Sequence, residues 1–169
     1  MTELPADVIA LGFGGNVGEE SAIVERFGHA RDALRQLGDV KSAALYRTAP
    51  IGPAQQQFLN TAVRVRAPDV TPEELLALLH ELERLLGRDR AREVRWGPRE
   101  IDLDVLLWGT RVFRTPELEV PHPRLAERRF AIVPLIDLFG EELLVGGVSL
   151  GTLRERVKAQ DLEESATTW

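Results

Sequence analysis

The sequence contains no cysteine and no long uninterrupted apolar run. Without cysteine, a disulfide framework and a thiolate metal site are both excluded, and the composition suits a reducing compartment. A transmembrane helix needs about 18 consecutive apolar residues. The N-terminal run MTELPADVIALGFGG also lacks the basic segment that precedes the apolar part of a secretory signal. We therefore expect a cytoplasmic protein with no membrane partner.

Lysine is scarce too, and the positive charge is carried almost entirely by arginine. Of the 21 basic residues, only Lys41 and Lys158 are lysines, and the formal net charge is -6. An acidic protein is not typical of general nucleic-acid binders, so we expect no nucleic-acid partner. Several arginines nevertheless gather in one segment: Arg84, Arg88, Arg90, Arg92, Arg95 and Arg99. Because the planar guanidinium group binds phosphate in bidentate fashion, this segment predicts a local anion site.

The hydrophobic patterns predict a single α+β domain over residues 1–169. Apolar runs and alternation indicate strands at 8–13, 40–47, 57–66 and 100–108, and apolar residues at helical spacing indicate helices at 19–37 and 71–87. This βαββαβ order predicts a ferredoxin-like antiparallel sheet with helices packed on it, as a two-layer or three-layer sandwich. We also expect a short edge strand near 111–113 and helices near 125–129 and at 149–158.

The best-marked helix boundary lies at Thr71. Thr71 suits the N-cap, Pro72 suits the first helical position, and Glu73 and Glu74 place acids in the first turn, where the helix dipole favours them. The segments 48–56 and 88–99 lack periodicity and are predicted to be loops. The second of these loops carries most of the clustered arginines.

Two aspartates stand directly after the arginine-rich loop. Asp102 and Asp104 are two apart on a predicted strand, so their side chains leave the same face, with Cα atoms roughly 6–7 Å apart. Such carboxylates repel each other unless a cation lies between them, and Mg²⁺ prefers one or two carboxylates together with substrate phosphates. The pattern predicts a metal–triphosphate platform. The alternative is a solvated strand with ordinary acids, beside arginines that pair with Asp89, Glu93 or Glu81.

Trp96 interrupts the polar arginine-rich loop. A large apolar ring in a loop must be covered, and both a nucleobase and the protein's own core could cover it. Taken alone, Phe58 could be a core residue of an alternating strand, Asn60 a polar residue facing solvent, and His122 a turn residue between two prolines.

Four ordered segments carry a resemblance to a known family. They are Leu11-Gly-Phe-Gly-Gly-Asn16, Tyr46–Pro53 with Phe58-Leu-Asn60, Glu83–Asp104, and Val120–Phe130. Together they resemble the signature of 6-hydroxymethyl-7,8-dihydropterin pyrophosphokinase over about residues 8–137. The resemblance implies an ATP-dependent diphosphokinase of tetrahydrofolate biosynthesis. Such an enzyme transfers pyrophosphate from ATP to the hydroxymethyl group of the pterin and gives AMP and the pterin diphosphate.

The resemblance also implies residue roles. Two Mg²⁺ ions would be held by Asp102 and Asp104, in keeping with two-metal catalysis. The catalytic arginines would be Arg88, Arg90, Arg95 and Arg99, and the nucleotide would contact Glu83, Arg88, Trp96, Arg99, Ile101, His122 and Arg128. The pterin would lie between Phe58 and Phe130 and would contact Thr48, Ala49, Ile51 and Asn60.

The chain departs from the family pattern at a few positions. Gly15 stands where serine is common, Ala49 where proline is common, and Phe58 where tyrosine is frequent. The stretch between Gly87 and Trp96 is about one residue longer than usual, which leaves the phosphate contacts open among Arg90, Arg92 and Arg95.

Two other classes of function remain open at this point. A ferredoxin-like sheet can bind RNA through aromatic residues, and a non-catalytic nucleotide-binding domain could keep the fold without turnover. The acidic charge and the paired aspartates favour the enzyme. We expect a monomer with ATP and 6-hydroxymethyl-7,8-dihydropterin as its partners.

Overall fold

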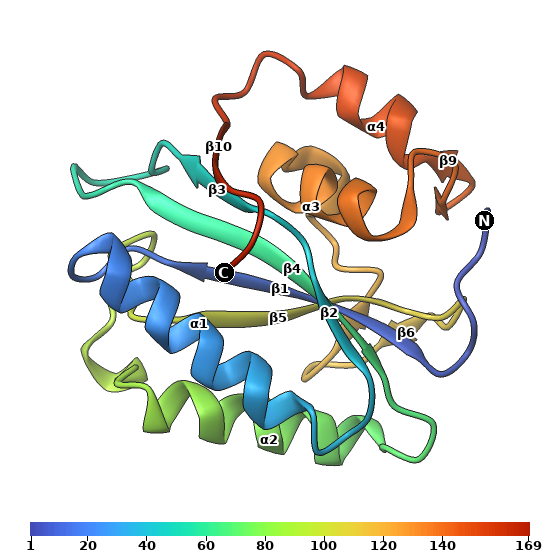
Figure 1. The fold of residues 1–169 in the computed structure, drawn as a ribbon, viewed down its shortest axis with the longest axis horizontal. Coiled ribbons are helices and arrows are strands. Elements are labelled where there is room, and N and C mark those ends of the chain that lie inside the picture. Colours follow the sequence, from blue (N-terminus) through green and yellow to red (C-terminus); the bar gives the residue numbers. More distant parts are fainter.

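A computed structural model describes all 169 residues, and it shows three layers (Figure 1). The central sheet contains β1 (Val8–Gly15), β2 (Val40–Ser42), β3 (Leu45–Thr48), β4 (Phe58–Arg66), β5 (Asp102–Trp108) and β10 (Glu163–Ala166). Helices α1 (Glu20–Leu34) and α2 (Pro72–Leu85) cover one face, and α3 (Arg129–Phe139) and α4 (Leu150–Arg156) cover the other. None of these helices combines the length and the apolar composition needed to cross a membrane.

The main sheet is antiparallel and confirms the predicted ferredoxin-like arrangement. Its strand order is β10-β3-β4-β1-β5, and β2 also pairs with β4. The strand expected at 40–47 is divided in two, because the backbone leaves the regular ladder at Ala43 and Ala44. There the Thr61 hydroxyl donates to the carbonyl oxygens of Ala43 (3.3 Å) and Ala44 (2.8 Å). Of the two predicted sandwich types, the three-layer form is the one observed.

Side-chain alternation divides the interior into two cores. Leu103 and Val105 belong to the core on the α1/α2 side, whereas Ala10 and Leu106 belong to the core on the α3/α4 side. The predicted start of α2 is confirmed by a capping box. The Glu74 amide donates to the Thr71 hydroxyl (3.2 Å), and the Thr71 amide donates to the Glu74 carboxylate (2.9 Å).

Several element boundaries differ from the predictions. The helix expected near 125–129 is confirmed in part: a short 3-10 helix covers Leu125–Glu127, and the regular helix that follows is α3. Its run RFAIVPLIDLF is apolar nearly all round and contains Pro134, so helical periodicity does not mark it. The extended piece near 111–113 is instead a hairpin of β6 (Phe113–Arg114) and β7 (Glu119–Val120). A second small hairpin, β8 (Leu144–Val145) with β9 (Val148–Ser149), was not predicted.

The C-terminal segment adds a strand that the sequence patterns do not reveal. β10 pairs with β3, and Trp169 then packs against the core on the α1/α2 side of the sheet. Its ring centroid lies 6.3 Å from that of Phe13 and 6.0 Å from that of Phe27. The Arg31 guanidinium lies 4.5 Å from the indole centroid, and the indole N–H donates to the Ala43 carbonyl at 2.9 Å. These contacts tie the C-terminal segment to β1, α1 and the β2–β3 break.

Replacing this indole should measurably destabilise the fold. We expect Trp169→Ala to lower the free energy of unfolding by about 2 kcal/mol, less than for a fully buried tryptophan because Trp169 is half-buried. Trp169→Phe keeps the ring packing and loses only the hydrogen bond to Ala43, so its cost should be about 1 kcal/mol. Urea denaturation followed by far-UV circular dichroism measures both. An alanine variant as stable as the wild type would contradict the packing role of Trp169.

Candidate active site

A cavity of about 220 Å³ lies on the α3 side of the main sheet. Its floor is formed by β1 and β5, and its walls by the end of β3, the start of β4, the start of α3 and three loops. Figure 1 shows the β1–α1, β3–β4 and α2–β5 loops at the same end of the sheet, on the left of the view. The floor and aromatic walls include Gly12, Gly14, Thr48, Phe58, Asn60, Leu106 and Phe130, and the polar walls include Arg99, Asp102, Asp104, His122 and Arg128.

The two aspartates line this cavity together, as expected from their spacing. On β5, Asp102 lies opposite Gly14 of β1, and Asp104 lies opposite Gly12. These glycines leave little room for any larger residue. A Cβ atom on Gly12 would lie 3.3 Å from the Leu106 side chain, and one on Gly14 would lie 3.2 Å from the Asn60 amide oxygen. The glycines of β1 therefore keep the cavity floor open beside both carboxylates.

The two carboxylates differ in their cationic partners. Asp102 accepts a hydrogen bond from the Arg88 guanidinium at 2.7 Å, whereas Asp104 has no ion pair. Burial, with the neighbouring charge of Asp102, raises the pKa of Asp104 to about 7, against the opposing influence of Arg128. A half-buried carboxylate without a cation, next to a second carboxylate on the same face, is a donor set that suits a hard divalent ion.

Arg88 and Glu83 form a buried ion cluster behind Asp102. The side chains of Arg88 and Glu83 are only 5% and 2% exposed. Arg88 donates to both Glu83 and Glu93 as well as to Asp102, and Arg90 reaches Glu83 at 3.1 Å. Neither Arg88 nor Glu83 lines the cavity. The structure therefore places them where they orient Asp102, one layer behind the cavity wall.

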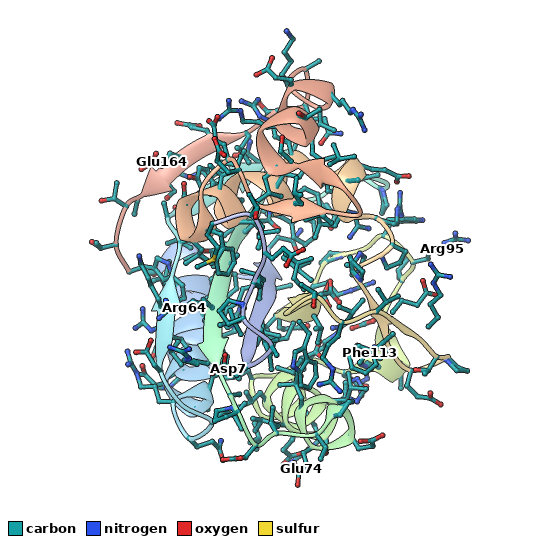
Figure 2. All side chains as sticks on the ribbon, turned by 90° about the vertical axis from the view of Figure 1, so that its right-hand side faces the viewer. Asp7, Arg64, Glu74, Arg95, Phe113 and Glu164 are labelled. Atoms are coloured by element: carbon teal, nitrogen blue, oxygen red, sulfur yellow. The ribbon has the colours of Figure 1, made fainter.

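The remaining predicted arginines take different positions in the 88–99 loop. Arg99 lines the cavity, and its guanidinium donates to the Val94 carbonyl at 3.3 Å. Arg90 and Arg95 do not line it. Arg95 is exposed, and Figure 2 shows its side chain at the periphery of the molecule. Ile101, expected on the nucleotide side, is fully buried in the α1/α2 core.

The residues predicted for the pterin side are brought together in one part of the cavity. Thr48, Ala49, Ile51, Phe58, Asn60 and Phe130 all line it. Asn60 and Thr48 are buried, and the Asn60 amide donates to the Thr48 hydroxyl at 2.7 Å. This hydrogen bond fixes the orientation of the amide, whose carbonyl oxygen accepts no hydrogen bond from the protein. The amide oxygen is therefore an available acceptor next to two aromatic rings.

His122 and Arg128 lie on the opposite wall from the strand ends. The His122 Nδ1 atom accepts a hydrogen bond from the Arg124 amide at 3.1 Å, so the neutral ring carries its proton on Nε2. Burial, followed by the charge of Arg128, lowers the pKa of His122. Burial also lowers the pKa of Arg128, with Arg124 adding to the effect. Arg128 therefore brings positive charge to this wall beside a neutral His122, and an anionic ligand would stabilise that charge.

Asn16 connects the loops around the cavity, a role that the sequence did not predict. It is only 2% exposed. Its amide group donates to the Gln55 side chain (3.0 Å) and to the Gln56 carbonyl (2.9 Å), and its oxygen accepts from the Arg99 amide (2.9 Å). Asn16 thus joins the three loops around the cavity. The only signal for it in the sequence is the Gly-Gly-Asn turn that ends the first strand.

Comparison with known proteins identifies the family. The family model described as 7,8-dihydro-6-hydroxymethylpterin-pyrophosphokinase (HPPK) matches residues 10–140. The chain belongs to this family. HPPK proteins are pyrophosphokinases, so this chain is an ATP-dependent transferase that moves pyrophosphate to hydroxymethyldihydropterin in folate biosynthesis.

Relatives named 2-amino-4-hydroxy-6-hydroxymethyldihydropteridine pyrophosphokinase support the HPPK assignment. The Bacillus subtilis protein is 39% identical over 136 residues, which cover 78% of each chain. The Pseudomonas aeruginosa protein is 34% identical over 148 residues, covering 86% of this chain and 88% of the relative.

Larger proteins contain a matching region as well. The wild-type HPPK-DHPS structure from Plasmodium falciparum superposes with a TM-score of 0.65 at 13% identity and shares the fold. The match covers 91% of this chain and 41% of that one. This chain therefore spans less than half the length of the HPPK-DHPS chain.

Proposed function

We propose that this HPPK chain performs pyrophosphoryl transfer in the cavity between β5 and α3, as one domain over residues 1–169. Asp102 and Asp104 would hold two Mg²⁺ ions, which neutralise phosphate charge and polarise the transferring group. The observation that carries the proposal is the common face of these two carboxylates, which lies in one cavity with a cationic wall and two aromatic rings. A monomer working in the cytoplasm is part of the same proposal.

The aromatic part of the cavity is suited to a flat heterocycle. We assign Phe58 and Phe130 to stacking, because both line the cavity and aromatic faces bind planar rings well. Asn60 would read the polar edge of the pterin through its available carbonyl oxygen. Thr48 orients that amide, and Ala49 and Ile51 would add contacts from the adjoining loop.

The cationic part of the cavity is suited to a triphosphate. Arg99, His122 and Arg128 line this part, and Trp96 borders it from the arginine-rich loop. Phosphoryl transfer depends mainly on positioning and on neutralisation of charge, which these side chains provide. Glu83 and Arg88 would act through Asp102, while Arg90 and Arg95 would contact phosphate only after the 88–99 loop moves.

The proposed reaction is one in-line displacement. The hydroxymethyl oxygen of the pterin forms a bond to the β-phosphorus of ATP, and the bond from that phosphorus to the α–β bridging oxygen breaks. AMP leaves with the bridging oxygen, and the hydroxyl proton passes to solvent. Closure of loops around such a site excludes water that would otherwise compete with the pterin.

Nucleotide analysis tests the proposal directly. Purified protein is incubated with ATP, Mg²⁺ and 6-hydroxymethyl-7,8-dihydropterin, and the nucleotides are separated by chromatography. We expect AMP that forms only when the pterin and Mg²⁺ are both present. Formation of ADP would instead indicate transfer of a single phosphoryl group. Binding of both substrates without turnover would favour a non-catalytic domain.

A further inference from the structure

Trp96 has an unusual backbone conformation at the rim of the cavity. It is the one non-glycine residue of the chain with a positive φ, 62°. Large side chains rarely adopt this left-handed region, and such strain persists only where surrounding contacts hold it. The Trp96 side chain is also partly exposed, at 37%. The contacts around Trp96 must therefore be specific enough to keep the residue in place.

The β3–β4 loop holds Trp96 from one side. A Cβ atom on Gly52 would lie 2.6 Å from the Trp96 Cβ atom, so the two backbones approach as closely as glycine permits. The Gln55 side chain donates to the Trp96 carbonyl at 2.7 Å. Gln55 is fixed in turn by Asn16, which donates to its amide oxygen at 3.0 Å. This side of the contact is made by main-chain and amide groups.

Arg124 holds Trp96 from the other side. Its guanidinium carbon lies 4.9 Å from the centroid of the indole ring, a distance typical of cation–π contacts. Arg124 belongs to the segment between β7 and α3, which also carries His122 and Arg128, and its side chain approaches Glu127 at 3.6 Å. Arg124 does not line the cavity. It contacts the arginine-rich loop at Trp96.

We propose that Arg124 is a positioning residue that clasps Trp96 and thereby holds the 88–99 loop against the cavity. The clasp joins the 121–130 segment to the Trp96 end of a loop that is also attached through the β3–β4 loop and Asn16 and, at its start, through the ion pairs of Arg88 with Glu83 and Asp102. Trp96, Gly97 and Arg99 of the held loop all line the cavity. Loss of the clasp leaves each of these residues intact and shifts the loop toward conformations in which they are withdrawn from the cavity.

Limited trypsin digestion of the full chain reports on the loop without requiring activity. Arg90, Arg92 and Arg95 are exposed cleavage sites, and when opening is fast their cleavage rate follows the population of the open loop. We expect Arg124→Ala to speed cleavage at these sites between about twofold and fivefold, the range that an exposed cation–π contact produces. Arg124→Lys keeps a cation above the indole and should give an intermediate rate. Arg114→Ala, a change in the distant β6 hairpin, should leave the rate unchanged.

The kinetic consequence rests on the proposed function, whereas the proteolytic consequence does not. We expect kcat/KM for ATP to fall only as far as the population of the closed loop falls, with the KM for the pterin unchanged and the melting temperature lowered by no more than a few degrees. Cleavage of Arg124→Ala at the wild-type rate would overturn the clasp, as would equal acceleration in Arg124→Ala and Arg124→Lys. If the wild type forms no AMP but Arg124→Ala loosens the loop, the proposed function fails and the clasp stands.

Discussion

Asp104→Asn should reduce kcat by about a thousandfold while the protein remains folded. A bound divalent ion stabilises transition-state charge by several kcal/mol, and about 1.4 kcal/mol corresponds to a tenfold change in rate. The amide has nearly the same shape as the carboxylate, so the cavity should keep its geometry. Asp69→Asn is the matched control, because Asp69 is exposed in the turn before α2. Near-normal turnover of Asp104→Asn at saturating Mg²⁺ would rule out the assignment of Asp104 as a metal ligand.

The same variant should be more stable than the wild type in metal-free buffer at alkaline pH. The pKa of Asp104 is raised from its ordinary value of 3.8 to about 7. Between these values the folded state binds more protons than the unfolded state, so the stability of the wild type falls as pH rises through this range. Asp104→Asn lacks this titration. Its advantage in melting temperature should therefore be large at about pH 8 and small at about pH 4.

Magnesium should reverse the order of the two proteins. An ion that binds only the folded state raises the melting temperature, and the wild type retains both carboxylates for it. We expect added Mg²⁺ to stabilise the wild type and to leave Asp104→Asn nearly unaffected. An equal shift in both proteins would show that the ion binds elsewhere.

Arg88→Ala should destabilise the fold by about 3 kcal/mol, in addition to any loss of turnover. Removing one partner of a buried ion pair costs about 3–5 kcal/mol, because the other charge is left without compensation. Here the remaining charge is Glu83, whose side chain is 2% exposed. The lower end of the range applies because Arg90 still reaches Glu83. Urea denaturation measures the change.

Two further variants test the cause of this loss of stability. The first removes an exposed ion pair in place of the buried one, and the second removes the carboxylate that Arg88→Ala leaves without its partner. Arg84→Ala removes an arginine from the exposed pair with Glu81 one helical turn away and should leave the free energy of unfolding essentially unchanged, because solvent screens such a pair. Glu83→Gln combined with Arg88→Ala should recover part of the lost stability, because the uncompensated carboxylate is gone. If the double variant is no more stable than Arg88→Ala alone, the cost does not come from the buried charge of Glu83.

Because side chains alternate between the two faces of a strand, part of the cavity could be predicted from the sequence. Asp102 and Asp104 could be placed on one face because a strand repeats every two residues, and the cavity contains both. The same rule puts Phe58 and Asn60 on one face of β4, but only the resemblance to a family predicted that they belong to the site. The resemblance to a family also predicted Phe130 and His122. Phe130 lies at the start of α3 and His122 in the turn after β7, where local sequence patterns do not determine which way a side chain points.

Contacts between distant segments account for what the sequence did not predict. From the sequence pattern alone, Arg88 is expected to be a solvated loop residue. In the structure it is buried, because it pairs with Glu83 and Asp102 from other elements. Asn16 acts by hydrogen bonds to residues that are about forty or more positions away. The strand β10 has few apolar residues, and its place depends on the packing of Trp169. In each case the deciding partner is remote in sequence, so propensity and periodicity carry no signal.

β10 forms one edge of the main sheet. An uncovered strand at a sheet edge offers free N–H and C=O groups to another chain, and natural proteins protect such edges with short strands and charged residues. Here β10 occupies the outer side of β3, and it is short, with exposed Glu163 and Glu164. Figure 2 shows Glu164 on this strand at the periphery of the molecule. The C-terminal segment thus covers the pairing groups on the outer side of β3 and leaves a short acidic strand at this edge, an arrangement expected to disfavour pairing with a second copy.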